Sequence, residues 1–109
     1  MTYVGAWSAE TSADSEGWTP ENPSWGQCAI TALVLQDLFG GDLLRSTVNG
    51  VSHYWNRLPD GSEVDITLRQ FGADAKCDAP PVDRERDYVL SFPETVARYE
   101  LLRKRMGLR

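Results

Sequence analysis

The chain has 109 residues and a formal net charge of −5, which fits one domain and leaves no room for a second hydrophobic core. Hydrophobic residues make up 41% of it, a share typical of a globular protein. The charge is uneven, because residues 94–109 hold five basic and two acidic side chains and the rest is acidic. An acidic body argues against a nucleic-acid partner, since phosphate contacts need a basic face. We interpret the basic segment as the solvated face of a helix that ends in cations, with contact to an anionic partner as the alternative.

The first residues carry no pattern of a targeting signal, because they lack a charged region followed by a long apolar run. No stretch approaches the ~20 apolar residues that a membrane span needs. Cys28 and Cys77 are far apart and form no CxxC motif, so the sequence predicts neither a disulfide framework nor a zinc site. We therefore expect a cytoplasmic protein with free thiols, no membrane partner, no metal and no cofactor. The sequence carries no signal for the oligomeric state.

The first predicted elements are a loop and a buried helix. Residues 11–24 are turn-rich and polar, which predicts an ordered loop. Ser24 and Gln27 then have the S-x-x-Q spacing of a capping box, which predicts a helix from about Trp25 to Leu38. That helix is apolar nearly all round, which indicates burial, and the glycine pair at 40–41 ends it.

An antiparallel meander is predicted next. Its three strands are Asp42–Val48, Val51–Leu58 and Ser62–Leu68. Asn49-Gly50 is a strong signal for the first tight turn, and Pro59-Asp60-Gly61 makes the second.

The last third of the chain predicts a loop, a short strand and a helix. Residues 72–83 indicate the loop, and Asp87–Ser91 indicates a short fourth strand. Ser91 and Glu94 have the spacing of a second capping box, which opens the C-terminal helix. The apolar stripe of that helix consists of Phe92, Val96, Tyr99, Leu102 and Met106. The order of elements predicts one α+β domain over residues 1–109, in which the cysteine-bearing helix packs on the meander.

Cys28 falls in the first turn of the predicted buried helix. Unpaired N–H groups and the positive end of the helix dipole lie there, and both favour a thiolate. The same N–H groups can stabilise an oxyanion on an attacked carbonyl. A small buried hydrophobic residue is the other interpretation of a free cysteine.

The turn after the second strand decides whether His53, the only histidine, can meet Asp65. A two-residue loop would place the two side chains on opposite faces. A three-residue loop, with Pro59 at the first central position of a type I turn and Gly61 in the left-handed position, places them on one face as diagonal neighbours. The turn residues favour the three-residue loop. They predict that the Asp65 carboxylate orients the His53 imidazole. With Cys28 as nucleophile and His53 as base, the three residues then form a catalytic triad.

Short motifs in this region resemble the transglutaminases. Gly26-Gln27-Cys28 is similar to the Gly-Gln-Cys that begins their active-site helix. His53-Tyr54-Trp55-Asn56 is similar to their His-x-Trp-Asn strand, and Asp65-Ile66-Thr67 to their Asp-x-Thr strand. The order along the chain also agrees. The resemblance covers about residues 24–68, and it supplies neither the added domains nor the calcium sites of the large transglutaminases.

Nearly the whole chain is similar to a small bacterial group, the YunG-like proteins. The residues that carry this likeness are Asn22-Pro23-Ser24-Trp25-Gly26-Gln27-Cys28, His53-Tyr54-Trp55-Asn56, Asp65-Ile66-Thr67 and Gln70-Phe71. The resemblance implies a transglutaminase-like or papain-like thiol fold.

The sequence thus predicts an enzyme that acts on a small-molecule or peptide amide or ester through a Cys28 thioester, as a hydrolase or an acyl transferase. Trp25 and Trp55 are candidate walls of its site. Asn22 is a candidate oxyanion donor, and Gln27 a capping residue that also adjoins the nucleophile. Two alternatives stay open. One is a non-catalytic module of the same fold that binds a small molecule or a peptide, and the other is a metal site built from Cys28, His53 and Asp65.

Overall fold

The computed structural model describes residues 3–108 as an α+β protein whose helices pack on one antiparallel sheet. Its helices are α1 (Tyr3–Ala6), α2 (Cys28–Phe39), α3 (Arg86–Val89) and α4 (Pro93–Arg105), with short 3-10 helices η1 (Ala9–Thr11) and η2 (Leu68–Phe71). Its strands are β1 (Asp42–Val48), β2 (Val51–Arg57), β3 (Glu63–Val64) and β4 (Val82–Arg84). None of the helices in residues 3–108 combines the length and apolar character that crossing a bilayer requires.

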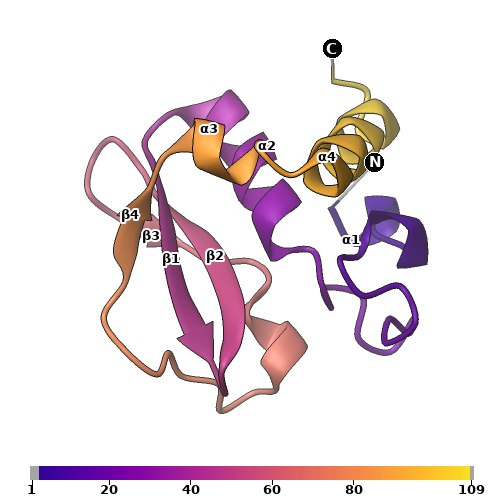
Figure 1. Ribbon diagram of the computed structural model, residues 1–109, viewed down its shortest axis with the longest axis horizontal. Coiled ribbons are helices and arrows are strands. Elements are labelled where there is room, and N and C mark those ends of the chain that lie inside the picture. The colour runs from indigo at the N-terminus through magenta and orange to yellow at the C-terminus, as the bar shows by residue number, and fades with distance from the viewer. Residues whose placement is uncertain (1–2, 109) are drawn as a thin grey trace.

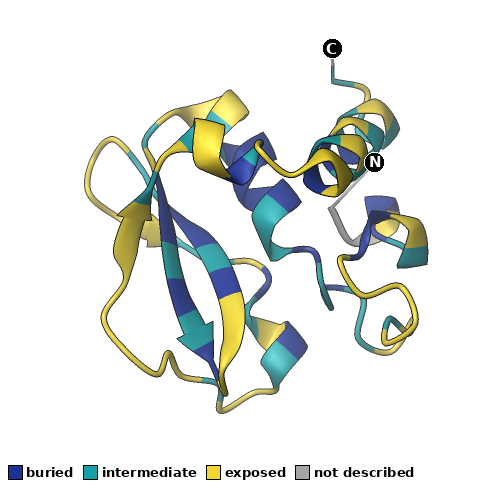
Figure 2. Ribbon diagram, in the orientation of Figure 1, coloured by how far each residue is buried: buried dark blue, intermediate teal, exposed yellow. Residues whose placement is uncertain are grey.

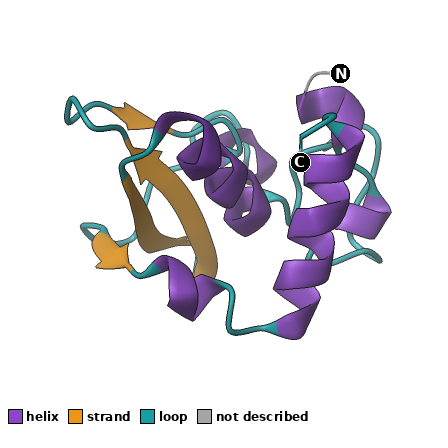
Figure 3. Cartoon of the chain, turned by 90° about the horizontal axis from the view of Figure 1, so that it is seen from above, coloured by secondary structure: helices purple, strands orange, loops and turns teal. Residues whose placement is uncertain are grey.

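The elements form layers, with α2 between the sheet and α4 (Figure 1). Figure 3 shows the same three layers from above. The N-terminal segment, α1 with η1, lies below α4 in Figure 1 and also meets α2, since Trp7 Nε1 donates to Thr31 Oγ1 at 3.0 Å. The main hydrophobic core fills the space around the middle of α2, so Ile30 to Leu35 are all buried, whereas Leu38 and Phe39 at its C-terminal end are exposed (Figure 2). The core consists of Ala6, Trp7, Ile30, Ala32, Leu33, Val34, Leu43, Val89, Tyr99 and Leu102.

The sheet has the order β3-β2-β1-β4, and its β1–β2 hairpin follows the predicted ranges closely. Asn49 and Gly50 have φ values of 52° and 79°, so both residues of the turn are left-handed, as a type I′ turn requires. Beside them, the Asp78 carboxylate accepts from both of their N–H groups and from the Thr47 hydroxyl. The loop that follows η2 is therefore hydrogen-bonded to the tip of the β1–β2 hairpin through Asp78.

The predicted register of the second hairpin is confirmed. Asn56 pairs with Val64 and Arg57 with Glu63, which corresponds to the three-residue loop. The Gly61 N–H donates to the Leu58 carbonyl at 2.9 Å. Gly61 itself has a φ of 90°, the left-handed conformation that the loop demands at this position.

The third strand is much shorter than predicted, because it ends at Val64. Asp65 is the cause. Its Oδ1 accepts from the backbone N–H of Thr67 at 3.3 Å, and such a local contact competes with ladder pairing. The chain then turns into η2 instead of extending along β2.

The predicted fourth strand at Asp87–Ser91 is wrong. The strand beside β1 is β4 (Val82–Arg84), and the predicted segment instead contains the helical turn α3. Val89 of α3 packs into the main core, so tertiary burial explains its apolar character. The capping box predicted at Ser91 is also absent, because α4 begins at Pro93 with no side-chain cap.

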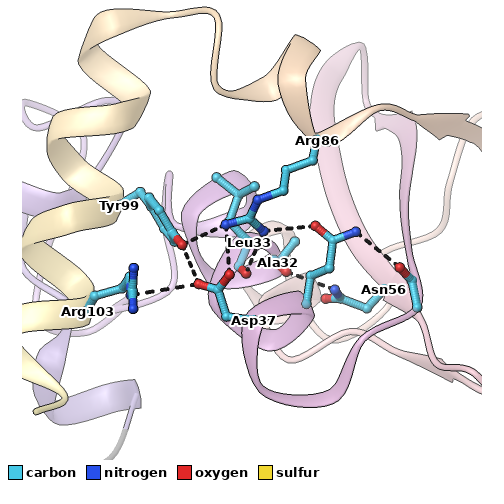
Figure 4. A network of polar contacts seen from close by, with 9 residues as sticks. Ala32, Leu33, Asp37, Asn56, Arg86, Tyr99 and Arg103 are labelled. Carbon is cyan, nitrogen blue, oxygen red and sulfur yellow. Dashed lines mark hydrogen bonds and ion pairs between the residues drawn. The ribbon is translucent and has the colours of Figure 1, made fainter. Parts of the chain in front are cut away.

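A polar network joins α2, α3 and α4 (Figure 4). The Arg86 guanidinium donates to Asp37 and to the Tyr99 hydroxyl, each at 2.7 Å. The Tyr99 hydroxyl donates in turn to Asp37, and Arg103 lies 3.8 Å from the same carboxylate. The network fixes α4 against the C-terminal half of α2.

The basic C-terminal segment is less solvated than the sequence indicates. Arg103 lies against Asp37, and Arg105 pairs with Glu10 at 2.8 Å and also donates to the Ala6 carbonyl. Much of its charge therefore holds α4 to α2 and to the N-terminal segment. In the predicted apolar stripe of α4, Tyr99 and Leu102 are buried, whereas Phe92 is 47% exposed.

Candidate active site

Cys28 is the first residue of α2, three positions later than the predicted helix start. Gly26 is the reason, since its φ of 71° is incompatible with a right-handed helix. Its N–H donates to Gln70 Oε1 and its carbonyl accepts from Ala13, each at 2.9 Å. The predicted capping box fails as well, because Gln27 is the N-cap and makes no side-chain cap bond. Long-range contacts therefore bend the chain sharply just before the cysteine.

The thiol of Cys28 lies at the edge of β2 and is partly exposed. Its Sγ is 3.9 Å from the carbonyl oxygen of Ser52, the residue before His53. The N–H groups of the first turn of an α-helix have no partner within the helix. Cys28 thus combines an accessible sulfur with backbone donors of its own turn.

His53 is fully buried, at 0% exposure, and its ring is held from several sides. Its Nε2 lies 2.6 Å from Asp65 Oδ2. The indole of Trp55 stacks on the imidazole with the ring centres 5.5 Å apart, and the Phe71 ring meets it edge-on at 5.3 Å. These contacts fix the plane of the imidazole.

The second ring nitrogen, Nδ1, is buried and has no hydrogen-bond partner within the usual distance limits. Burial lowers the pKa of His53, but the hydrogen bond to Asp65 and the nearby Cys28 sulfur together outweigh it and raise the pKa from 6.5 to about 9. Since Nε2 is engaged by Asp65, the atom that faces Cys28 is Nδ1. Near neutral pH the ring therefore carries a proton, and it lies between a carboxylate and a sulfur.

A cleft of about 420 Å³ opens beside Cys28. Trp25 and Gly26 form one side of it, next to the sulfur. The sheet side and the α3–α4 side are formed by Arg45, Val51, Ser52, Tyr54, Tyr88, Phe92 and Arg98, among others. A substrate in this cleft would have direct access to the thiol.

The remaining predicted site residues are distributed around this centre. Trp25 lines the cleft, and its Nε1 donates to Asp14 at 3.1 Å. Trp55 is buried, stacks on His53 and donates to Glu63 at 2.7 Å, so it holds the imidazole in place and does not line the cleft.

Asn22 and Gln27 have their amide donors engaged elsewhere. Asn22 Nδ2 donates to the Gln70 carbonyl at 2.9 Å, and Asn22 does not line the cleft. Gln27 is fully buried and its Nε2 donates to the Ser8 carbonyl at 3.0 Å. Both side chains brace the segments before α2, and an oxyanion role for Asn22 remains a prediction.

Sequence reasoning missed the functional residues that come from distant segments. Gln70 and Phe71 of η2 hold Gly26 and His53, and only their place in the YunG-like pattern pointed to them. Arg98 reaches the cleft from α4, where the sequence indicated only a solvated basic face. No local pattern distinguishes Arg98 from its basic neighbours.

Cys77 is exposed in the loop before β4, as the sequence indicated. Partial burial of its thiol and the nearby charges of Asp65, Asp78 and Glu63 raise its pKa. Burial contributes more to this shift than the carboxylates do. Cys77 therefore has an environment that disfavours a thiolate, and it serves as an internal reference for Cys28.

Fold and site together define a small α+β protein with a cysteine at a cleft and, behind it, a buried histidine bonded to an aspartate. The chain belongs to the YunG family, whose model, described as YunG protein, matches residues 2–109. It is 38% identical over 84 residues to the "Uncharacterized protein YunG" of Bacillus subtilis strain 168, an alignment covering 77% of this chain and 70% of that relative. No solved structure matches the chain.

Proposed function

We propose that this protein is a cysteine-dependent hydrolase or acyl transferase that acts on an amide or an ester, with a transglutaminase-like or papain-like arrangement of its site. The observation that carries the proposal is the position of the His53 ring. Its Nε2 lies 2.6 Å from Asp65, its buried Nδ1 has no hydrogen-bond partner, and Cys28 is near enough to contribute to the raised pKa of the ring. A histidine held in this way is oriented as a general base toward a nucleophile.

The reaction begins with the proton of the Cys28 thiol already on His53 Nδ1, because the raised pKa keeps the ring positively charged near neutral pH, and the sulfur is a thiolate. The thiolate attacks the substrate carbonyl carbon and forms a C–S bond, while the carbonyl oxygen takes up the negative charge. His53 then returns the proton to the leaving amine or alcohol, whose bond to the carbon breaks and leaves a thioester on Cys28. Water or an amine next attacks the thioester, and His53 accepts and returns the proton in the same way.

Asp65 acts through His53 and does not touch the substrate. Its carboxylate fixes the imidazole orientation and compensates the positive ring, which buried surroundings would otherwise disfavour. The oxyanion is stabilised by the N–H groups of the first turn of α2, beginning with that of Cys28. This proposal assigns the oxyanion to the backbone rather than to Asn22, whose amide is engaged with Gln70.

The same geometry favours the nucleophile over a metal centre. Asp65 already occupies Nε2 at 2.6 Å, and the other nitrogen, Nδ1, points in a divergent direction, so one ion cannot bind the ring together with both Asp65 and Cys28. Within residues 3–108 no group of three His, Cys, Asp or Glu side chains is placed to hold a metal ion.

Acylation by p-nitrophenyl acetate tests the proposal. We expect a burst of p-nitrophenol and an acetyl adduct on Cys28, detected by peptide mass spectrometry near neutral pH. Cys28→Ala should abolish the burst. Cys77→Ala is the matched control and should retain it, because Cys77 lies outside the cleft.

Alkylation by iodoacetamide gives an independent measure. Cys28 should react much faster than Cys77 in the same molecule. Equal, slow alkylation of both thiols, together with no acetyl adduct on Cys28, would contradict the enzyme and leave the binding module as the function of this fold.

A further inference from the structure

The cleft beside Cys28 has an unusual charge for this acidic protein. The chain has a net charge of −5, yet two arginines, Arg45 and Arg98, line the cleft. Its one carboxylate is that of Asp14, which already accepts from Trp25 Nε1 and from the Gly17 N–H. Cations are thus concentrated where a substrate must lie.

Arg98 is the less compensated of the two arginines. Its guanidinium donates only to Thr95 Oγ1, at 3.3 Å, and its Nε is buried without a partner. Burial lowers its pKa, and only the charges of Glu94 and Cys28 act in the other direction. A guanidinium that has lost water and gained no carboxylate lacks part of its stabilisation.

Arg45 approaches the same space from β1. Its Nε donates to Ser52 Oγ at 3.2 Å, and within residues 3–108 it forms no ion pair. By contrast, other arginines of the protein do pair with carboxylates. These are Arg57 with Asp42 and Asp83, Arg86 and Arg103 with Asp37, and Arg105 with Glu10.

An anionic group would supply the hydrogen-bond acceptors and the negative charge that Arg98 and Arg45 lack. A guanidinium presents several N–H donors in one plane, which match the oxygens of a carboxylate or a phosphate. The rim of the cleft is apolar, since Val51, Tyr88 and Phe92 are 45%, 50% and 47% exposed. The cleft therefore suits a molecule with an apolar part and an anionic group.

We propose that the substrate of Cys28 carries a carboxylate or a phosphate near its reactive carbonyl, and that Arg98 and Arg45 bind this group inside the cleft. The inference rests on the proposed function, because it names the substrate class of the same site. Arg98 and Arg45 are specificity-determining residues in this account, and they take no part in proton transfer.

Two alkylating agents of nearly equal size but different charge test the inference. Iodoacetate carries a carboxylate and iodoacetamide does not, so their rate ratio at Cys28, divided by the ratio at Cys77, measures recognition of the anion. Arg98→Gln should lower this quotient by roughly three- to tenfold, the effect expected of one partly screened charge at close range. Because the iodoacetamide rate is the denominator of the ratio, a change in the general reactivity of the thiol cancels in the quotient.

The control is Lys104→Gln, which removes one positive charge from the exposed side of the same helix, away from the cleft. Arg45→Gln is a second test variant, should Arg98→Gln fold poorly. If the quotient for both arginine variants equals that for Lys104→Gln, the inference is overturned. The quotient is independent of how fast Cys28 reacts, so a slow iodoacetamide reaction would count against the proposed function alone.

Protection experiments then distinguish the two anions. Sodium phosphate and sodium acetate are compared with sodium chloride at equal ionic strength, as inhibitors of iodoacetamide alkylation at Cys28. Stronger protection by phosphate assigns a phosphate group, and stronger protection by acetate assigns a carboxylate. Protection no greater than that by chloride counts against an anion site.

Discussion

His53 Nε2 and Asp65 Oδ2 lie 2.6 Å apart, although Asp65 follows the last residue of β3 and is no longer part of the sheet. The pair depends on the loop Pro59-Asp60-Gly61, whose three residues set the register that turns both side chains to one face. The geometry of the site is therefore determined by a turn that does not contact it.

Shortening that loop tests the dependence. Deletion of Asp60 leaves two residues, a length that favours the register in which His53 and Asp65 face opposite sides. We expect a folded protein in which Cys28 alkylation by iodoacetamide is slowed at least about tenfold, the lower range for loss of an oriented base. Pro59→Ala keeps the loop length and is the control. An unchanged rate in the deletion variant would show that the register does not position the base.

The protonation of His53 can be followed directly, because it is the only histidine in the chain. NMR titration of the ring should give a midpoint of about 9, well above the ordinary 6.5, since Asp65 and Cys28 together outweigh burial. Asp65→Asn should lower the midpoint. A wild-type midpoint at or below 6.5 would mean that burial dominates and that the ring is neutral in the resting protein.

The same shift links folding to pH. The folded ring holds its proton more tightly than the unfolded chain does, so its contribution to stability is fully present below about pH 6.5. That contribution is lost as the pH rises through about 9.

Substitutions should separate the roles of base and orienter. His53→Ala should reduce acylation of Cys28 by about 10²- to 10⁴-fold, the usual contribution of a general base. Asp65→Asn should reduce the acylation rate by a factor about one to two orders of magnitude smaller, because Cys28 and His53 both stay in place. Burst kinetics with p-nitrophenyl acetate give both numbers. If Asp65→Asn were as damaging as His53→Ala, the carboxylate would have a role beyond orientation.

Gly26 should be essential for placing the nucleophile. A Cβ at this position would lie 2.2 Å from Ser12 Oγ and 2.8 Å from the Ala13 nitrogen, in addition to the strain of a positive φ. Gly26→Ala should destabilise the protein by about 2–4 kcal/mol and slow alkylation of Cys28. Gly50→Ala has a similar φ but open space around it, so it should cost only about 1–2 kcal/mol and leave the thiol unaffected.

Urea unfolding and iodoacetamide kinetics on both variants separate strain from steric conflict. Equal losses of stability in Gly26→Ala and Gly50→Ala would mean that the surrounding loop relaxes around the added methyl group.

The parts of the fold that could be predicted are those encoded by short segments. The turn residues Asn49-Gly50 and Pro59-Asp60-Gly61 act through their own backbone preferences, and both hairpins have the predicted register. The contact between His53 and Asp65 followed from that register. Local chemistry was sufficient because each turn fixes the pairing of the strands beside it.

The parts that could not be predicted depend on contacts between distant residues. The helix begins at Cys28 and not at about Trp25, because Gln70 and Ala13 hold Gly26 in a left-handed conformation. The short apolar run within Asp87–Ser91 indicated a strand, but Val89 packs into the core as part of a helical turn. The cation in the cleft, Arg98, belongs to a helix 70 positions after the nucleophile. A short segment of sequence does not show which distant residues it will contact, so these three features could not be predicted.

The network around Asp37 has a mechanical consequence for the cleft. Cys28 begins α2 and Asp37 lies near its end, about 14 Å along the axis at the usual rise per residue. Tyr99, which bonds to Asp37, is the immediate neighbour of Arg98 in α4. Cys28 and Arg98 are thus connected through α2, the contact between Asp37 and Tyr99, and α4, and no strand takes part in this connection. Movement of the strands would therefore change the sheet side of the cleft but leave the distance between Cys28 and Arg98 unchanged, because the contacts of Asp37 fix α4 against α2.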